Sequence, residues 1–196
     1  MNKVFIVLLT SLLNVSFGEY IIKKEDIKES PQKAYFAAGC FWGVESLFQS
    51  LNGVLSTSVG YMNGNTENPN YKSVCYENTG HAEAVELIYN PKIISYRELC
   101  EYFWKIHDPT TKNQQGPDYG SQYRSAVFYI TENERKTAEE VKKQFQKFWN
   151  NSIITEINKA EKYYLAEDYH QNYFKNKGLT HGGCHYVRKF DLENKD

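Results

Sequence analysis

The sequence predicts a single α+β domain in which helices pack against a mixed β-sheet. Strand-like and helix-like segments follow one another without a regular βα repeat, and the 196 residues, 41% of them hydrophobic, suffice for one core of ordinary size. The 23 Lys and Arg residues nearly balance the 24 Asp and Glu residues. This balance argues against a nucleic-acid-binding protein and against a polybasic protein of the membrane surface.

The first 18 residues have the pattern of a secretory signal peptide. Lys3 gives a positive start, residues 4–15 form an almost wholly apolar run, and Ser16, Phe17 and Gly18 follow where a signal peptidase cleaves. We therefore expect an exported protein, either periplasmic or secreted. The alternative is an uncleaved segment that tethers the protein to a membrane, although the run is shorter than the roughly 20 residues of a spanning helix.

A charged, exposed arm at residues 19–33 is expected to precede the folded domain at residues 34–196. Residues 34–38 form a short apolar run followed by a glycine, which predicts a buried strand and a tight turn. A helix should follow, because apolar residues recur at the spacing of one helix face, at positions 44, 47, 48 and 51. Cys40 would then lie in the first turn of that helix.

Three further strands and two loops are expected along the chain. The strands cover residues 54–61, 82–89 and 123–130, which are rich in strand-forming residues or alternate in polarity. The loops cover residues 62–70 and 108–122, which are polar and contain Gly and Pro.

Two more helices are predicted because each begins with a capping box. Ser95 is paired with Glu98, and Thr131 is paired with Glu134. Apolar residues follow each box at helical spacing, so both helices should pack one face on the core.

Cys40 is the first residue that could take part in catalysis. A thiol at a strand-to-helix turn lies near unpaired backbone N–H groups and the positive end of the helix dipole, which lower its pKa and favour the nucleophilic thiolate. The neighbouring Phe41 and Trp42 could form an apolar wall beside the sulfur. The alternative is a structural cysteine buried beside two aromatic residues of the core.

Glu83 is a candidate general acid. The alternation of the strand predicted at residues 82–89 places Glu83 on the same face as Val85 and Leu87. A carboxyl group on an apolar face loses hydration when it ionises, so its pKa should rise and it could donate a proton. The alternative is a carboxylate paired with Arg124 or with a lysine.

The loop at residues 116–125 could present Asp118 and the Tyr123 hydroxyl to a ligand. A proline stiffens this loop and glycines open it, and loops of this kind often bind ligands. The same composition is also typical of a solvated turn.

A glycine-rich segment at residues 177–185 precedes and includes Cys184. A thiol in a mobile segment can approach a second cysteine, as thiol–disulfide exchange requires, which suits a resolving cysteine. The alternative is a metal site begun by His181, Cys184 and His185, although no partner pair stands at a typical ligand spacing.

Cys75 and Cys100 are expected to have no part in the mechanism. Cys100 lies in the helix after Ser95 and is most simply a small core residue, while Cys75 lies in a Tyr-rich segment with Lys72 as its electropositive neighbour. The even number of cysteines in an exported chain is also compatible with structural disulfides.

Together these segments resemble the A-type peptide methionine sulfoxide reductases, from about Lys33 to Phe174. The matching pieces, in chain order, are Gly39-Cys40-Phe41-Trp42-Gly43-Val44-Glu45, Tyr71 with Thr79-Gly80-His81-Ala82-Glu83-Ala84, His107-Asp108-Pro109, Asp118-Tyr119-Gly120-Ser121-Gln122-Tyr123-Arg124-Ser125 and Ala166-Glu167-Asp168-Tyr169-His170-Gln171. For the fold we expect a two-layer α/β sandwich, the ferredoxin-like plait. Beyond Phe174 the sequence departs from the common family pattern, which has a pair of late cysteines, because Cys184 is the single late cysteine here.

The resemblance implies roles for five catalytic residues. Cys40 matches the family's nucleophile, and Glu83 matches the family's general acid. Tyr71 and Tyr123 match the hydroxyls that hold the sulfoxide oxygen. Cys184 is the candidate for the resolving cysteine, in a mobile C-terminal segment from about residue 175.

The resemblance also implies three substrate-binding residues. Phe41 and Trp42 match the aromatic wall that receives the methyl group of the substrate. Asp118 matches a carboxylate on the substrate side, which contacts the main chain of the oxidised residue.

The implied reaction reduces the S epimer of methionine sulfoxide, free or within proteins, and needs no metal or organic cofactor. The Cys40 thiolate attacks the sulfoxide sulfur while Glu83 protonates the oxygen, so that methionine leaves and Cys40 becomes a sulfenic acid. Cys184 then condenses with Cys40, and a thioredoxin-like dithiol protein reduces the disulfide. We expect a monomeric enzyme. The rival classes are an exported binding domain with a structural Cys40–Cys184 disulfide and a zinc protein.

Overall fold

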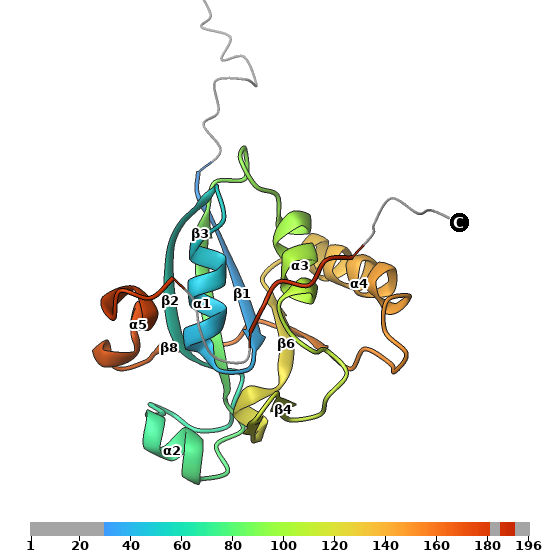
Figure 1. Ribbon diagram of the computed structural model, residues 1–196. Helices are drawn as coiled ribbons and strands as arrows, with labels where there is room; N and C mark the ends of the chain where they lie inside the picture. The colour runs from blue at the N-terminus through green and yellow to red at the C-terminus, as the bar shows by residue number, and fades with distance from the viewer. Residues whose placement is uncertain (1–29, 181–184, 191–196) are drawn as a thin grey trace, which may run out of the picture.

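A six-stranded mixed sheet forms the centre of the structure, a computed structural model that describes residues 30–180 and 185–190 (Figure 1). The strands follow the sheet order β7-β6-β1-β3-β2-β8, with the bounds β1 (Gln32–Ala38), β2 (Val54–Met62), β3 (Ala82–Tyr89), β6 (Ser125–Tyr129), β7 (Glu156–Lys159) and β8 (Tyr163–Leu165). A separate hairpin pairs β4 (Gln114–Gln115) with β5 (Asp118–Tyr119).

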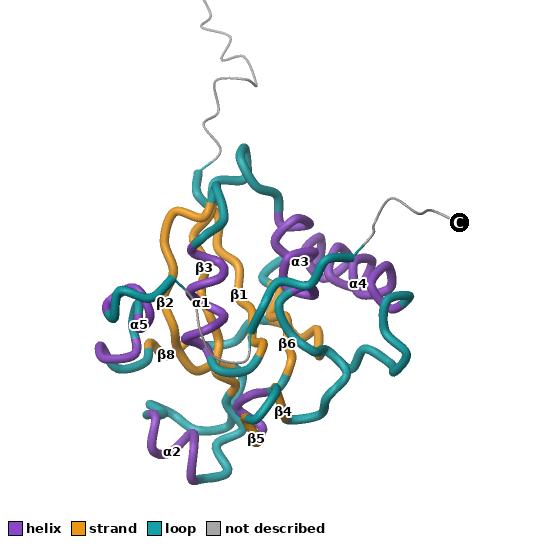
Figure 2. Tube along the Cα trace, in the orientation of Figure 1, coloured by secondary structure: helices purple, strands orange, loops and turns teal. Residues whose placement is uncertain are grey.

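Helices α1, α3 and α4 pack on one side of the sheet, and the short helices α2 and α5 lie at its margin (Figure 2). The helices are α1 (Phe41–Gln49), α2 (Tyr71–Tyr76), α3 (Tyr96–Lys105), α4 (Glu132–Gln146) and α5 (Tyr173–Asn176). Two 3-10 turns, η2 (Ser121–Tyr123) and η3 (Asp168–His170), complete the described elements.

The chain order and the pairing of the four central strands match the ferredoxin-like plait. The elements follow one another as β1-α1-β2-β3-α3-β6, and the strands lie in the antiparallel order β6-β1-β3-β2. This is the split βαβ arrangement. Strand β7 extends one edge in parallel with β6, and β8 extends the other edge antiparallel to β2. The expected α+β fold and its two-layer plait are confirmed.

Most of the expected elements are present, with small shifts at their ends. Both predicted capping boxes form, since Ser95 and Thr131 each accept a hydrogen bond from the backbone N–H three residues later. Strand β1 begins two residues earlier than expected, because Gln32 and Lys33 already pair with β3. Strand β6 begins two residues later than expected, because the 3-10 turn η2 ends at Tyr123.

The main hydrophobic core lies between the sheet and helices α1, α3 and α4. Val85 and Leu87 of β3 point into this core, while Ala82 and Ala84 of the same strand belong to a smaller cluster on the opposite face. Cys100 is fully buried in α3, as expected for a core residue.

The proposed signal peptide and most of the proposed arm lie outside the described residues. Across residues 30–180 and 185–190, no helix combines the length and the apolar character that crossing a membrane requires.

Candidate active site

Cys40 is the N-cap residue of α1 and joins that helix to the end of β1. The preceding Gly39 has a φ of +98°, a conformation that favours glycine. A Cβ atom at Gly39 would also lie 2.6 Å from the side chain of Gln115. The turn therefore requires glycine, and it holds the partly exposed residue Cys40 at the start of α1, where the sequence predicted it.

The resting pKa of Cys40 is raised, not lowered as the sequence suggested. Burial is the largest cause, and the charges of Glu83 and Asp118 add to it, so the pKa rises to about 12. The backbone N–H groups of Trp42 and Gly43 do bond the sulfur and lower the pKa, but burial outweighs them. Protonation of Glu83 removes its charge and so eases ionisation of the thiol.

Glu83 lies on β3 with its side chain 1% exposed, facing the main core as predicted. Its Oε2 atom accepts a hydrogen bond of 3.0 Å from the backbone N–H of Phe41, the residue after the candidate nucleophile. Burial raises the pKa of Glu83 to about 8, and the charge of Asp118 contributes to the rise. The carboxyl group is therefore mostly protonated near neutral pH.

The alternative pairing of Glu83 with Arg124 does not occur. Arg124 instead lies 3.2 Å from the carboxylate of Glu156 and donates to the backbone oxygens of Ser121 and Asn63. Among the described residues, Glu83 makes no ion pair. Its environment is thus that of a neutral acid.

The other polar candidates lie within electrostatic reach of Cys40 and Glu83. Burial raises the pKa of Tyr71 and of Tyr123, and the charge of Glu83 raises both further. The charge of Asp118 in turn raises the pKa values of Cys40, Glu83 and Tyr123. Three segments distant in sequence therefore meet at one site.

Phe41 and Trp42 have different environments. Phe41 is 1% exposed and packs against the rings of Tyr61 and His170, with centroid distances of 5.9 and 5.1 Å. Trp42 is partly exposed at the start of α1. The core interpretation thus holds for Phe41, whereas Trp42 presents part of its indole to solvent.

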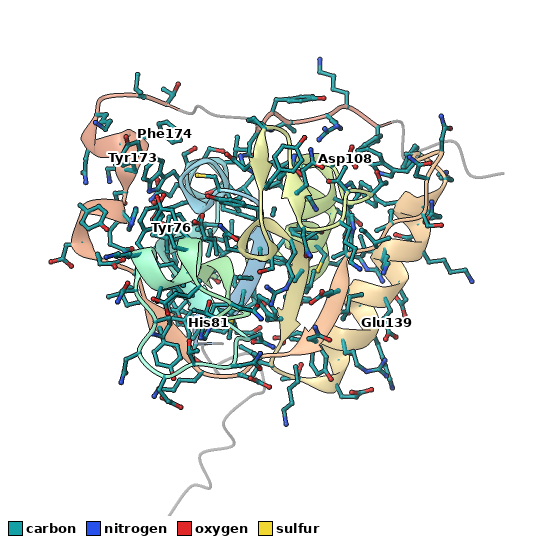
Figure 3. The ribbon with its side chains drawn as sticks, turned by 90° about the horizontal axis from the view of Figure 1, so that it is seen from below. Tyr76, His81, Asp108, Glu139, Tyr173 and Phe174 are labelled. Atoms are coloured by element: carbon teal, nitrogen blue, oxygen red, sulfur yellow. The ribbon has the colours of Figure 1, made fainter. Side chains whose placement is uncertain are left out.

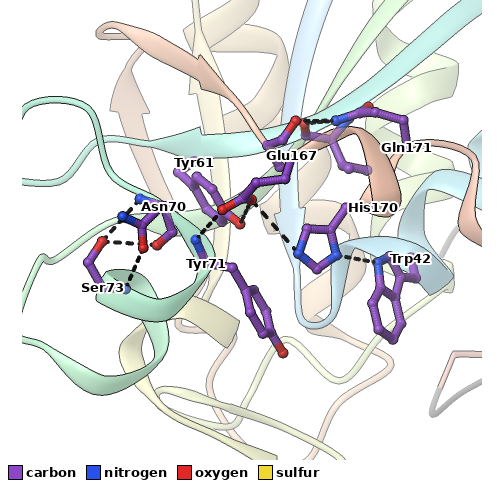
Figure 4. Close-up of polar contacts among 10 residues, drawn as sticks. Trp42, Tyr61, Asn70, Tyr71, Ser73, Glu167, His170 and Gln171 are labelled. Atoms are coloured by element: carbon purple, nitrogen blue, oxygen red, sulfur yellow. Dashed lines mark hydrogen bonds and ion pairs between the residues drawn. The ribbon is translucent and has the colours of Figure 1, made fainter.

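Trp42 is held by two contacts from the C-terminal part of the chain. Its indole N–H donates to Nδ1 of His170 at 3.0 Å (Figure 4). The ring also stacks on Tyr173 of α5, with centroids 3.7 Å apart and planes inclined by 4°. Figure 3 shows Tyr173 and its neighbour Phe174 on α5, at the side of the molecule opposite Glu139 of α4.

Glu167 connects this contact to Tyr71. One carboxylate oxygen of Glu167 accepts the backbone N–H of Tyr71 at 2.8 Å, and the other accepts the Tyr61 hydroxyl at 2.9 Å (Figure 4). The same carboxylate lies 3.8 Å from Nε2 of His170, which is buried. Glu167 thus holds the backbone of Tyr71, and the adjacent His170 holds the indole of Trp42.

Sequence reasoning assigned no individual role to Glu167, His170 or Tyr173. The motif that contains Glu167 and His170 was part of the family resemblance, and that match was the available signal. The sequence also predicts no part for Cys75 in the mechanism. Its thiol nevertheless hydrogen-bonds the side chain of Tyr71, and the charge of Glu83 raises its pKa. Cys75 therefore borders the site, although burial raises its pKa.

Two residues of the C-terminal hypotheses, Cys184 and His181, lie outside the described residues. Within residues 30–180 and 185–190, no three His, Cys, Asp or Glu side chains gather as metal ligands. The assignment of Cys184 as resolving cysteine therefore stays a prediction.

Comparison with known proteins gives consistent matches along most of the chain. A family model described as peptide methionine sulfoxide reductase matches residues 32–195. The peptide methionine sulfoxide reductase MsrA of Methanosarcina acetivorans is 52% identical over 160 residues, which are 79% of this chain and 85% of that protein.

Two solved structures of one relative are also similar. Reduced Mxr1 from Saccharomyces cerevisiae superimposes with a TM-score of 0.77 at 39% identity, covering 82% of this chain and 93% of that one. Mxr1 in complex with Trx2 matches with a TM-score of 0.57 at 29% identity, covering 82% of this chain and 91% of that one.

Proposed function

The chain belongs to the peptide methionine sulfoxide reductase family, and we propose that it reduces methionine sulfoxide with Cys40 as nucleophile and Glu83 as proton donor. The observation that carries this proposal is the bond from the Phe41 N–H to Glu83. It attaches a buried acid to the residue that follows Cys40. A thiol and a neutral carboxyl group thus lie beside each other, as attack on a sulfoxide requires.

In the proposed first step, the Cys40 sulfur attacks the sulfoxide sulfur and forms an S–S bond with it while Glu83 protonates the sulfoxide oxygen. The S–S bond then breaks as the oxygen passes to the Cys40 sulfur, so methionine is released and Cys40 becomes a sulfenic acid. The substrate is reduced as the thiol is oxidised. The resting thiol of Cys40 is weakly acidic, since its pKa is about 12. Neutral Glu83 would therefore both supply a proton and remove a charge that opposes the thiolate.

We assign the substrate contacts as follows. The partly exposed indole of Trp42, fixed by His170 and Tyr173, would receive the S–CH₃ group, with Phe41 behind it. The hydroxyls of Tyr71 and Tyr123 would hold the sulfoxide oxygen.

Asp118 would bind the main chain of the oxidised residue. Its charge acts on both Cys40 and Glu83, which supports a position beside the reacting atoms. By family analogy we propose the S epimer as substrate.

Recycling would use Cys184 and an external dithiol protein. The Cys184 thiol condenses with the Cys40 sulfenic acid, which forms the S–S bond and releases water. The solved complex of Mxr1 with Trx2 supports a thioredoxin-like reductant for this chain as well. That reductant would return both cysteines to thiols and become a disulfide itself.

Turnover with a small dithiol tests the proposal. The purified protein with dithiothreitol should consume methionine-S-sulfoxide and leave the R epimer unchanged. Cys40→Ser should abolish the reaction, whereas Cys100→Ser, a change at a fully buried helix position, should retain it in protein that folds. Equal consumption by Cys40→Ser would refute the assignment of the nucleophile.

A further inference from the structure

The C-terminal residues 185–190, here called the C-terminal strap, cross the molecule from the end of β1 past α3 to α4 (Figure 1). The backbone N–H of Arg188 donates to the carbonyl of Lys105, the last residue of α3, at 2.8 Å. Phe190 stacks on Phe148, with a centroid distance of 4.8 Å, and meets Phe145 edge-on. A mobile segment was expected from about residue 175, but this part of it is packed on the domain.

His185 fixes the other end of the strap beside the candidate nucleophile. Its Nε2–H donates to the carbonyl of Ala38, the last residue of β1, at 2.7 Å. The side chain is 4% exposed, and a Cβ atom at Gly39 would lie 3.3 Å from Nε2. The imidazole thus packs directly on the turn that carries Cys40.

A second observation places His185 near the reacting groups. The charge of Asp118 raises the pKa of both Cys40 and His185, so both lie within reach of one carboxylate. Burial is nevertheless the larger influence and lowers the pKa of His185. A neutral imidazole with its proton on Nε2 satisfies the observed bond.

The bond between His185 and Ala38 joins two segments of the chain that each carry a cysteine of the recycling step. His185 directly follows Cys184, and Ala38 stands two residues before Cys40. A disulfide requires the two Cα atoms to approach within about 4.4–6.8 Å. A hydrogen bond that joins the residue after Cys184 to the residue two before Cys40 shortens the search that brings the two sulfur atoms together.

We propose that His185 is a positioning residue for the recycling step, which through its bond to the Ala38 carbonyl keeps the chain at Cys184 within reach of oxidised Cys40. The inference rests on the proposed function. His185 takes no part in the release of methionine and exchanges no proton or electron in the condensation. It raises the rate at which the Cys184 thiol displaces water from the Cys40 sulfenic acid.

The test separates the two half-reactions in the full chain. Enzyme is mixed with methionine-S-sulfoxide without reductant, methionine release is followed by rapid quench, and the Cys40 sulfenic acid is trapped with dimedone. His185→Ala should release methionine at close to the wild-type rate. It should form the Cys40–Cys184 bridge about tenfold more slowly, as expected for one lost buried hydrogen bond, and should accumulate trapped sulfenic acid.

Two variants distinguish positioning from loss of structure. Gln places an amide nitrogen near the position of the histidine Nε2, so His185→Gln should restore rapid bridging, whereas His185→Asn is too short to reach Ala38 and should stay slow. Val187→Ala is the matched control on the strap, because Val187 is 46% exposed, and it should behave as wild type. If His185→Ala does not fold, the slow bridging is measured in His185→Asn instead.

The outcomes are distinct for the two proposals. Wild-type bridging in both His185→Ala and His185→Asn, or slow bridging in His185→Gln with normal methionine release, would overturn the positioning role. Failure of the wild-type enzyme to release methionine would instead overturn the proposed function itself.

Discussion

Glu83 shows how burial sets the chemistry of a single residue. Its pKa rises from 4.5 to about 8 because the carboxyl group lies in the main core, and the one bond from Phe41 lowers it only in part. The acid is therefore protonated where an ordinary glutamate would be ionised. The same burial that makes Glu83 a proton donor also makes its ionisation costly to the fold.

The first prediction concerns catalysis by Glu83. Two ionisations act on the rate of methionine release in a single turnover: the Cys40 thiolate becomes more populated as the pH rises towards its pKa of about 12, and neutral Glu83 is lost above about 8. The rate should therefore rise with pH up to about 8 and level off above it. Glu83→Ala should lower that rate about 10²–10⁴-fold, and Glu83→Gln should lower it less because the amide still donates a hydrogen bond. Undiminished release by Glu83→Ala would remove this residue from the mechanism.

The second prediction concerns stability. The folded-state pKa of Glu83 lies above its unfolded value, so the folded protein binds more protons, and stability falls as the pH rises from about 4.5 to about 8. Glu83→Gln cannot ionise and should melt higher than wild type at alkaline pH, by about 2–4 °C for each kcal/mol gained. Thermal melts at acid and alkaline pH should show that the difference grows with pH. A constant difference would contradict the assigned pKa.

The site joins two parts of the fold, the start of α1 and the segment that contains η3 and α5. Trp42 on α1 is bonded by His170 and stacked on Tyr173, and Glu167 of the same segment bonds the backbone of Tyr71 on α2. Neither α2 nor α5 is longer than six residues. Their positions therefore depend on these contacts more than on helix propensity.

The third prediction tests this support. His170→Ala removes the acceptor for the Trp42 indole and should raise KM for methionine-S-sulfoxide about tenfold, the effect of one buried hydrogen bond. His170→Asn can place an amide oxygen near the former Nδ1 and should recover part of the affinity. Steady-state kinetics with dithiothreitol provide the measurement. A KM that stays at the wild-type value in His170→Ala would contradict a role in holding Trp42.

The elements that were predictable are those with strong local signals. The capping boxes at Ser95 and Thr131 form as the sequence predicts, because each of their hydrogen bonds joins residues only three positions apart. Strand β3 was predictable because one of its faces contacts the main core and the other a second cluster. The short strands β7 and β8 have mostly exposed or half-exposed residues, so their sequences contain no apolar pattern from which a strand could be predicted.

The location of the candidate site and the raised pKa of Glu83 were predictable from the sequence, but the raised pKa of Cys40 was not. The location of Cys40 and the orientation of Glu83 follow from local pattern, and both are confirmed. The raised pKa of Cys40 depends on burial and on Glu83 and Asp118, which lie far away in sequence. The contact of Cys75 with Tyr71 is local, because the two residues are i and i+4 on α2, and it was missed because no helix was expected at those residues.

We propose that residues 1–18 direct export of the protein. The apolar run at residues 4–15 after Lys3, followed by Ser16, Phe17 and Gly18, supports this proposal. The fourth prediction is a mature N-terminus at Glu19 in protein taken from outside the cytoplasm of its native source. N-terminal sequencing tests it, and a retained Met1 in a cytosolic fraction would contradict it.

The central claim is that Cys40 accepts the oxygen of methionine sulfoxide with the help of Glu83, and one single-turnover measurement tests it most directly. Reduced Cys184→Ser enzyme is mixed with methionine-S-sulfoxide without any reductant, and both released methionine and the mass of the Cys40 peptide are determined. We predict one methionine released per enzyme and one oxygen, trapped as sulfenic acid, on Cys40. Methionine release with Cys40 unmodified, or with the oxygen on Cys75 or Cys100, would contradict the account.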